Sequence, residues 1–267
     1  MSFRMKAIGT VFETTLNQYF VYRLSFVMWR FRNILNILLV YYLWTSVFAG
    51  KRTLFSYTQD QMITYVLLVN IAGAIVLSTR THEIASDILS GDIMNYLIKP
   101  ISVQWYITAR ELADKFLNIV LAGAEICLLL YIFTPRISLD LSTRSVAISL
   151  LFLGIGIVLS FLLSLQLSLI AFWTPEVWAP RFIFMVFVGF LSGNLVPLDI
   201  LPKAMYDALL LTPFPYLIYF SSKALVHGAT FPLVKPLIVS VGWCIVLAIL
   251  VRWTWKKGLK EFSFYGR

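Results

Sequence analysis

The chain has 267 residues, of which 60% are hydrophobic and only 13% are charged, and its formal net charge is +9. Its mean hydropathy is +0.83. Soluble proteins carry about 25% charged residues, so this composition excludes an ordinary soluble protein and indicates a polytopic integral membrane protein. The length allows about six crossings of roughly 20 apolar residues each, which predicts one transmembrane domain over residues 1–267 and no separate soluble domain.

Residues 1–25 mix polar and apolar side chains and do not fit a signal peptide, because no small-residue cleavage site follows the early basic residues. The apolar positions lie near helical spacing and are Phe3, Ile8, Val11, Phe12, Leu16, Tyr19 and Phe20. We predict an amphipathic helix on the membrane surface. The alternative is an amphipathic extension of the first membrane span.

Six apolar stretches are predicted to cross the membrane as helices, which makes the fold class all-α. They cover residues 34–49, 62–78, 116–133, 146–172, 182–196 and 237–251. The first stretch is short, and it can extend back toward Phe26 if Arg30 and Arg32 reach the lipid headgroups.

Basic residues favour one side of this six-span arrangement. The side that holds both termini carries 15 of them and the opposite side carries 7. Because Lys and Arg concentrate on the cytoplasmic side, both termini are predicted in the cytoplasm. We assign the positive charge to this topology and to anionic lipid, and we expect no nucleic-acid partner, because the basic residues do not form one face of a folded domain.

The longest predicted cytoplasmic connection covers residues 80–105. Glu83 and Asp87 lie one helical turn apart, Gly91 follows, and the apolar stretch after it stops at Lys99-Pro100. A short helix with apolar and acidic residues suits docking into a groove of a soluble partner. The alternative is an interfacial helix that rests on lipid.

Polar residues within the spans are candidates for a substrate pathway. Glu125 falls near the middle of the third span, with no basic residue at a matching depth in the predicted spans. Three roles are open for Glu125: it lines the pathway, it meets a polar group of a second subunit, or it is a neutral carboxyl bonded to a neighbouring helix. Gln166 and Asn194 are further candidates, although interhelical hydrogen bonds suit them better.

Before the last span, residues 190–228 remain apolar but are interrupted by Pro197, Pro202, Pro213 and Pro215. Proline removes a backbone donor and prevents one continuous helix. We therefore predict a re-entrant or interfacial hairpin over residues 197–223 on the extracytoplasmic side.

Catalytic motifs are missing from the sequence. His82 and Glu83 are not followed by a second histidine at zinc-binding spacing, and neither a G-x-S-x-G motif nor a phosphate-binding loop occurs. We predict no catalysis by this chain itself, and any ATP would be bound by another polypeptide. A secondary transporter and, less favoured, a membrane-embedded lipid-modifying enzyme are the alternatives.

Three groups of residues resemble type-2 ATP-binding-cassette (ABC) transporter permeases. Glu83, Gly91, Leu97, Pro100 and Ile101 resemble their first cytoplasmic loop. A second group resembles the hairpin that these permeases place before their last span. It consists of Ser192-Gly193, Pro197, Leu201-Pro202, Pro213-Phe214 and Gly228. The ending from Trp255 to Lys260, followed by Phe264-Tyr265-Gly266, is similar to the tail of a bacterial subgroup.

The resemblance implies an exporter permease of the bacterial cytoplasmic (inner) membrane. Its partners would be a separate ATPase subunit, which binds ATP and Mg, and a second permease, identical or related. No cofactor is expected on this chain. Residues 1–25 would be the connecting helix, and the prolines Pro197, Pro202, Pro213 and Pro215 would belong to an extracytoplasmic gate. ATPase coupling would fall to Glu83, Ile84, Asp87, Ile88, Gly91, Met94, Leu97 and Pro100.

Overall fold

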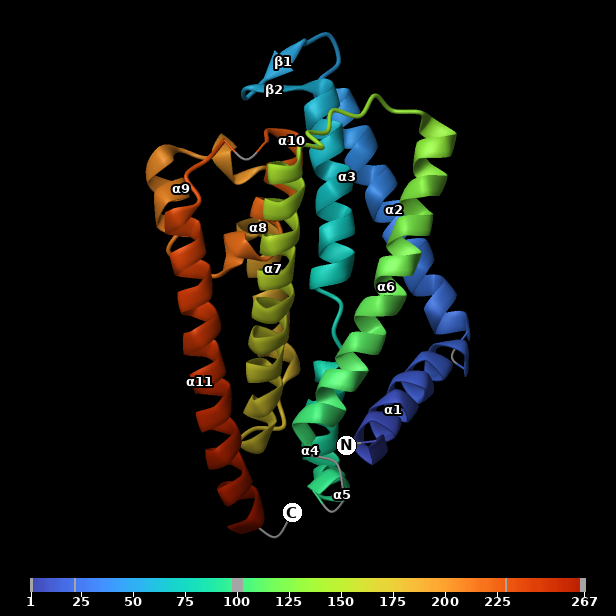
Figure 1. Ribbon diagram of the computed structural model, residues 1–267, viewed down its shortest axis with the longest axis vertical. Coiled ribbons are helices and arrows are strands. Elements are labelled where there is room, and N and C mark those ends of the chain that lie inside the picture. Colours follow the sequence, from blue (N-terminus) through green and yellow to red (C-terminus); the bar gives the residue numbers. More distant parts are fainter. Residues whose placement is uncertain (1, 22, 98–102, 229, 265–267) are drawn as a thin grey trace.

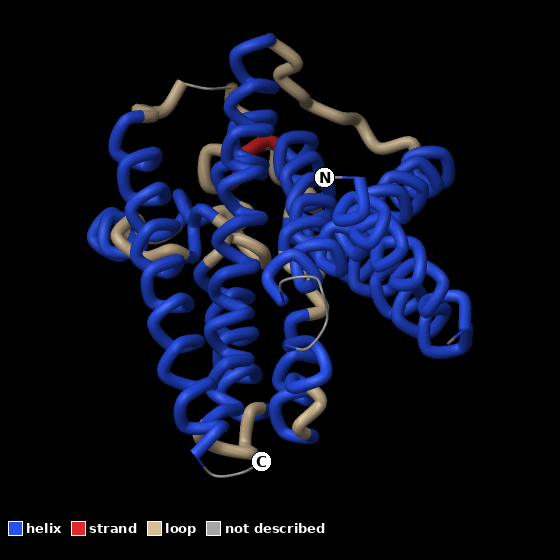
Figure 2. Tube along the Cα trace, turned by 60° about the horizontal axis from the view of Figure 1, so that its bottom comes forward, coloured by secondary structure: helices blue, strands red, loops and turns tan. Residues whose placement is uncertain are grey.

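A computed structural model describes residues 2–21, 23–97, 103–228 and 230–264. Within these ranges the chain is mostly helical, and strands β1 (Thr53–Leu54) and β2 (Tyr57–Thr58) form one short antiparallel hairpin (Figures 1 and 2). The predicted class, an all-α polytopic membrane protein, is confirmed.

Each predicted span overlaps one long helix. These helices are α2 (Arg23–Val47), α3 (Gln59–Val76), α6 (Val103–Phe133), α7 (Thr143–Leu169), α8 (Trp178–Leu191) and α11 (Val234–Phe264). Four segments of the described chain are long and apolar enough to cross a membrane, namely Gln59–Ser90, Trp105–Phe133, Thr143–Phe172 and Val234–Glu261. Helix α8 is apolar but shorter, and α2 contains Arg30 and Arg32. The number of six crossings therefore stays a prediction.

Helix α1 (Ser2–Val21) is set at an angle to α2 and lies against α6 (Figure 1). The rings of Phe12 and Phe116 have centroids 5.9 Å apart across the contact between α1 and α6. A helix is therefore present in the N-terminal segment where the sequence predicts one. Helices α4 (Thr81–Ser90) and α5 (Ile93–Leu97) lie at the same end of the molecule as both termini.

The hairpin before α11 folds into short helices: η2 (Leu198–Ile200), α9 (Lys203–Leu209), η3 (Phe214–Tyr216) and α10 (Tyr219–Val226). Pro197, Pro202 and Pro213 each precede one of these helices, and Pro215 lies within η3. Helix α10 packs between α3 and α7 at the end opposite the termini. The prolines thus break the segment into turns that fold back onto the bundle.

Close packing of this hairpin depends on Gly156 of α7. A Cβ atom at this position would clash with the carbonyl oxygen of Leu217, so only glycine lets the hairpin backbone approach α7 this closely. Leu217 and Tyr219 are fully buried there. The hairpin is part of the hydrophobic core rather than an exposed loop.

Candidate functional site

Helix α4 is a short amphipathic helix that begins just before Glu83 and ends just before Gly91. The spacing between these two residues is therefore the length of the helix. Glu83 lies in its first turn, and Gly91 follows its last residue with a φ of 85°. The Gly91 N–H donates to the Ile88 carbonyl at 3.3 Å. Such a left-handed residue ends a helix with little strain only when it is glycine.

One face of α4 is anchored in the bundle. Ile84, Ala85 and Ile88 are buried in a cluster with residues of α6, α7 and the turn η1 (Ile170–Phe172). Leu89 and Met94 point outward, with 46% and 48% of their surfaces exposed. The predicted coupling residues therefore divide between an inner and an outer face. Leu97 is in α5, and Pro100 lies outside the described residues.

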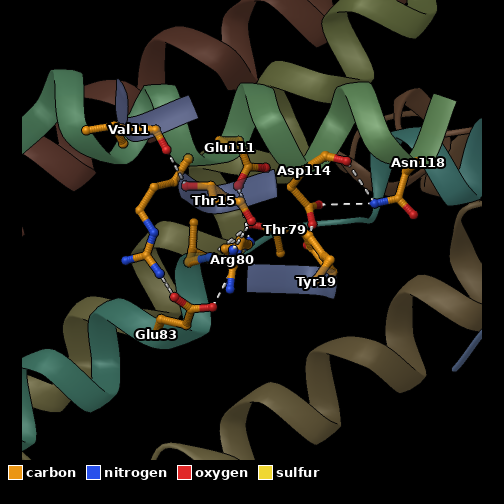
Figure 3. Close-up of polar contacts among 11 residues, drawn as sticks. Val11, Thr15, Tyr19, Thr79, Arg80, Glu83, Glu111, Asp114 and Asn118 are labelled. Atoms are coloured by element: carbon orange, nitrogen blue, oxygen red, sulfur yellow. Dashed lines mark hydrogen bonds and ion pairs between the residues drawn. The ribbon is translucent and has the colours of Figure 1, made fainter. Parts of the chain in front are cut away.

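Glu83 joins three helices through two arginines. Arg80 Nε lies 2.7 Å from one carboxylate oxygen of Glu83 (Figure 3), and Arg110 of α6 pairs with the other. Arg80 also donates to the Thr15 carbonyl of α1 at 3.4 Å. The carboxylate predicted to face a partner is therefore mainly engaged within the chain, where it ties α4 to α6 and to α1.

Further hydrogen bonds stabilise the same region, where α1, α4 and α6 meet. The Thr79 hydroxyl and the Arg80 N–H donate to Glu111 at 2.9 and 3.3 Å. The Tyr19 hydroxyl of α1 donates to Asp114 of α6. Burial, followed by the charge of Asp114, raises the pKa of Tyr19 above its ordinary value, which keeps the phenol a neutral donor.

Lys115 secures the end of α3 on α6. Its ammonium donates to the carbonyls of Val76, at 2.8 Å, and of Ser78. It also lies 3.3 Å from Glu111. Carbonyls at a helix C-terminus lack intrahelical donors and attract a cation, so Lys115 fixes the position where α3 ends and the chain turns toward α4.

Sequence reasoning missed this polar stripe of α6, although its spacing was readable. Its positions recur every three or four residues, which places them on one helix face. All are at least 92% buried, so the stripe faces the protein rather than solvent. The missed members are Glu111, Asp114, Lys115 and Asn118, and Glu125, which the sequence analysis did single out, lies further along the same helix.

Glu125 has a basic partner, contrary to the prediction. Arg30 of α2 approaches it at 3.2 Å, and the Asn33 amide donates to its second oxygen at 3.2 Å. Arg30 and Glu125 are each 8% exposed, so the pair is buried within the protein. The predicted spans held no such partner because the first was taken to begin at residue 34, whereas α2 begins at Arg23, which puts Arg30 inside the helix and facing α6.

A polar groove of about 390 Å³ lies between α2, α3, α7 and α8. Asn194 lines it, but Glu125 and Gln166 do not. Gln166 instead donates to Thr254 at 3.0 Å, which links α7 to α11 as expected of an interhelical hydrogen bond. The other main polar groups of the groove are Arg32, Asn33, Asn36, Asn70 and Arg181.

At the opposite end of the molecule, polar contacts fasten the proline-containing hairpin. Asp199 pairs with Lys223 at 2.9 Å and accepts from the Tyr57 hydroxyl at 3.0 Å. Lys223 also donates to the Tyr219 hydroxyl at 2.8 Å. The hairpin and the β1–β2 loop are thus held as one cap over α3.

Comparison with known proteins identifies the family. The model of a family described as "ABC-2 family transporter protein" matches residues 16–266. No curated protein sequence matches the chain. The family match extends from α1 through α4, the α6 stripe and the hairpin to the end of α11. The chain therefore belongs to the ABC-2 family of transporter proteins.

Proposed function

We propose that this chain is the permease of an ABC exporter and that a separate ATPase subunit drives it. Family membership makes it a membrane component of an ABC transporter rather than a secondary transporter or a lipid-modifying enzyme. In this proposal the partner ATPase binds ATP and Mg, and the chain binds no cofactor and is not catalytic. Both termini face the cytoplasm of a bacterium, and α2, α3, α6, α7, α8 and α11 make six crossings of its inner membrane.

The ion pairs of Glu83 with Arg80 and Arg110 are the observation that carries this proposal. The exposed side of α4 and α5, with Leu89 and Met94, receives the ATPase, whereas Ile84 and Ile88 fix α4 to the bundle. Because Glu83 is ion-paired to Arg110, a push on α4 is passed to α6, a helix of 31 residues. Closure of the ATPase pair would then tilt the helices as rigid bodies.

The polar groove forms this chain's share of the transport pathway. Polar side chains that face lipid are unfavourable, so the groove needs a cover within the membrane. A second permease, identical or related, provides it by packing across α2 and α8. The hairpin of residues 197–223 closes the pathway on the outer side, where Asp199 and Lys223 fasten it.

Mild-detergent purification of the chain from its native membrane tests the proposal. Mass spectrometry of the partners and an ATPase assay on the eluate are expected to find a soluble subunit with a phosphate-binding loop. A second permease in the eluate would identify the cover of the groove. A folded chain that is recovered alone and without ATPase activity would overturn the proposal.

A further inference from the structure

A second groove lies on another side of the molecule, between α6, α7 and α11. It consists of two adjoining hollows of about 490 and 530 Å³. They share Thr108, Phe161, Leu162 and Ala248 and therefore form one continuous channel. None of the residues that line the polar groove lines this one, so the two are separate sites.

The wall that α11 contributes changes from apolar to basic along its length. Its lining residues recur at helical spacing and are Cys244, Ile245, Ala248, Val251, Arg252, Trp255 and Lys256. From Cys244 to Lys256 the helix rises about 18 Å. One leaflet contributes half of a hydrocarbon core of roughly 30 Å, so the whole lined stretch, including its basic end, is about as long as a single leaflet.

The walls from α6 and α7 are apolar along most of this length. Phe161, Leu162 and Leu165 line the groove from α7. Its one carboxylate, Glu111, accepts from Thr79 and pairs with Lys115, whose ammonium also donates to the carbonyls of Val76 and Ser78. The charges of Glu111 and Lys115 therefore already have partners within the protein.

Arg252 and Lys256 are the two cations at the open end of the groove. Both are exposed, and neither forms a hydrogen bond or ion pair within the part of the chain that the structure describes. Being four residues apart, they lie on the same face of α11. A guanidinium binds a phosphate through two parallel hydrogen bonds, and a neighbouring ammonium adds a point charge.

We propose that this groove binds one anionic phospholipid of the cytoplasmic leaflet. An acyl chain lies along Ala248 and Phe161, Arg252 and Lys256 bind the phosphate headgroup, and Trp255 sits at the level of the interface. The site goes beyond the proposed transport function and does not depend on it. Only the choice of leaflet follows from the proposed orientation. The lipid would fill the space between α6, which carries Arg110, and the packed pair of α7 and α11.

Lys257 and Lys260 provide a matched control for general attraction between a basic helix end and anionic lipid. Both are exposed on α11 close to the site, and neither lines the groove. The Lys257 ammonium lies 5.3 Å from the ring centroid of Trp253 instead. If anionic lipid were held only by general attraction to basic residues, these lysines would contribute to binding as much as Arg252 and Lys256. If the lipid binds specifically in the groove, they would not.

The test uses the purified full-length chain in detergent with equal amounts of phosphatidylglycerol and phosphatidylcholine, with bound lipid counted by native mass spectrometry. The wild-type chain is expected to retain phosphatidylglycerol preferentially. Arg252→Gln with Lys256→Gln should lower the ratio of anionic to zwitterionic lipid by about 30-fold, as expected from two basic groups near a headgroup. Lys257→Gln with Lys260→Gln should change it less than about twofold if those charges stay outside the site.

Filling the groove gives an independent test. Ala248→Trp places a large ring where the two hollows join, and bound lipid of both classes should be lost while the thermal unfolding transition is retained. The proposal is overturned if the two double variants reduce the anionic preference equally, or if a folded Ala248→Trp variant retains its lipid. It is also overturned if the wild-type chain shows no anionic preference.

Discussion

Glu83 in the first turn of α4 forms an ion pair with Arg110 on α6, and this pair connects the end of the molecule that holds α4 to a helix that is long and apolar enough to cross a membrane. Arg80 binds the other oxygen of the Glu83 carboxylate and reaches α1 through the Thr15 carbonyl. One side chain thus links the N-terminal helix, the proposed coupling helix and the long helix α6 (Figure 3).

Breaking this pair should uncouple ATP hydrolysis from transport while the ATPase stays bound. In Glu83→Gln the amide cannot hold two arginines, so movement of α4 is no longer passed to α6. We expect transport per ATP hydrolysed to fall roughly tenfold, the effect of a coupling interaction of about 1–2 kcal/mol. The measurement is transport and ATP hydrolysis by the assembled complex in the same vesicles.

A charge swap serves as the control for this prediction. Glu83→Arg combined with Arg110→Glu restores one ion pair and should recover part of the coupling that each single variant loses. Equal coupling in wild type and Glu83→Gln would remove Glu83 from the transmission path.

The outer face of α4 and α5 should instead determine ATPase binding. Leu89→Asp and Met94→Asp each put a charge into the proposed interface, and ATPase recovery should fall about tenfold per variant, as for a residue at the centre of an interface. Leu141→Asp is the control, because Leu141 is 71% exposed in the loop before α7, at the opposite end. Normal recovery with both Asp variants would refute this docking surface.

Removing one partner of the buried pair between Arg30 and Glu125 should destabilise the protein strongly. Arg30→Met leaves a carboxylate that is 8% exposed without its cation, at a cost of about 3–5 kcal/mol. Adding Glu125→Gln removes that charge and keeps an acceptor for Asn33, so the double variant should be more stable than Arg30→Met. Thermal unfolding in one detergent compares the two variants, and equal midpoints would argue against a buried ion pair.

His227, which follows the last residue of α10, should make this end of the hairpin sensitive to acid. Its ring meets Tyr57 edge-on, with centroids 4.5 Å apart. Burial lowers the pKa of His227, an effect that Asp199 opposes and Lys223 supports. Below the ordinary histidine pKa of about 6.5, the unfolded chain binds a proton that the folded chain resists, so stability falls as the pH decreases.

The measurement for His227 is the unfolding midpoint at about pH 7.5 and about pH 5.5, on either side of that ordinary pKa. His227→Phe keeps a ring against Tyr57 and cannot be protonated, so it should lose part of the difference between the two midpoints. An unchanged difference would show that other groups cause the acid sensitivity.

The sequence predicted the helices that follow from local chemistry. Hydrophobic stretches located the six long helices, and the prolines located the broken hairpin, because both signals act over a few neighbouring residues. The spacing of Glu83 and Gly91 likewise reflects the length of one helix, from its first turn to its left-handed end.

Long-range partners could not be predicted in this way. Arg30 and Glu125 are 95 residues apart and meet only because α2 lies beside α6, so each charge seemed unpaired in the sequence. The inward direction of Ile84 and Ile88 also depends on where α7 lies. By contrast, the stripe from Glu111 to Asn118 was visible as helical spacing and could have been recognised.

The most direct test of the account is cysteine crosslinking from the outer face of α4 and α5 to the ATPase in native membranes. The native Cys127 and Cys244 are first replaced by serine, and Met94→Cys is then treated with a short thiol-to-amine crosslinker, with Leu141→Cys as the control. Docking of the ATPase on α4 and α5 predicts a crosslink between Cys at position 94 and a soluble ATPase subunit, and none from position 141. A folded complex in which position 94 crosslinks to no ATPase would contradict it.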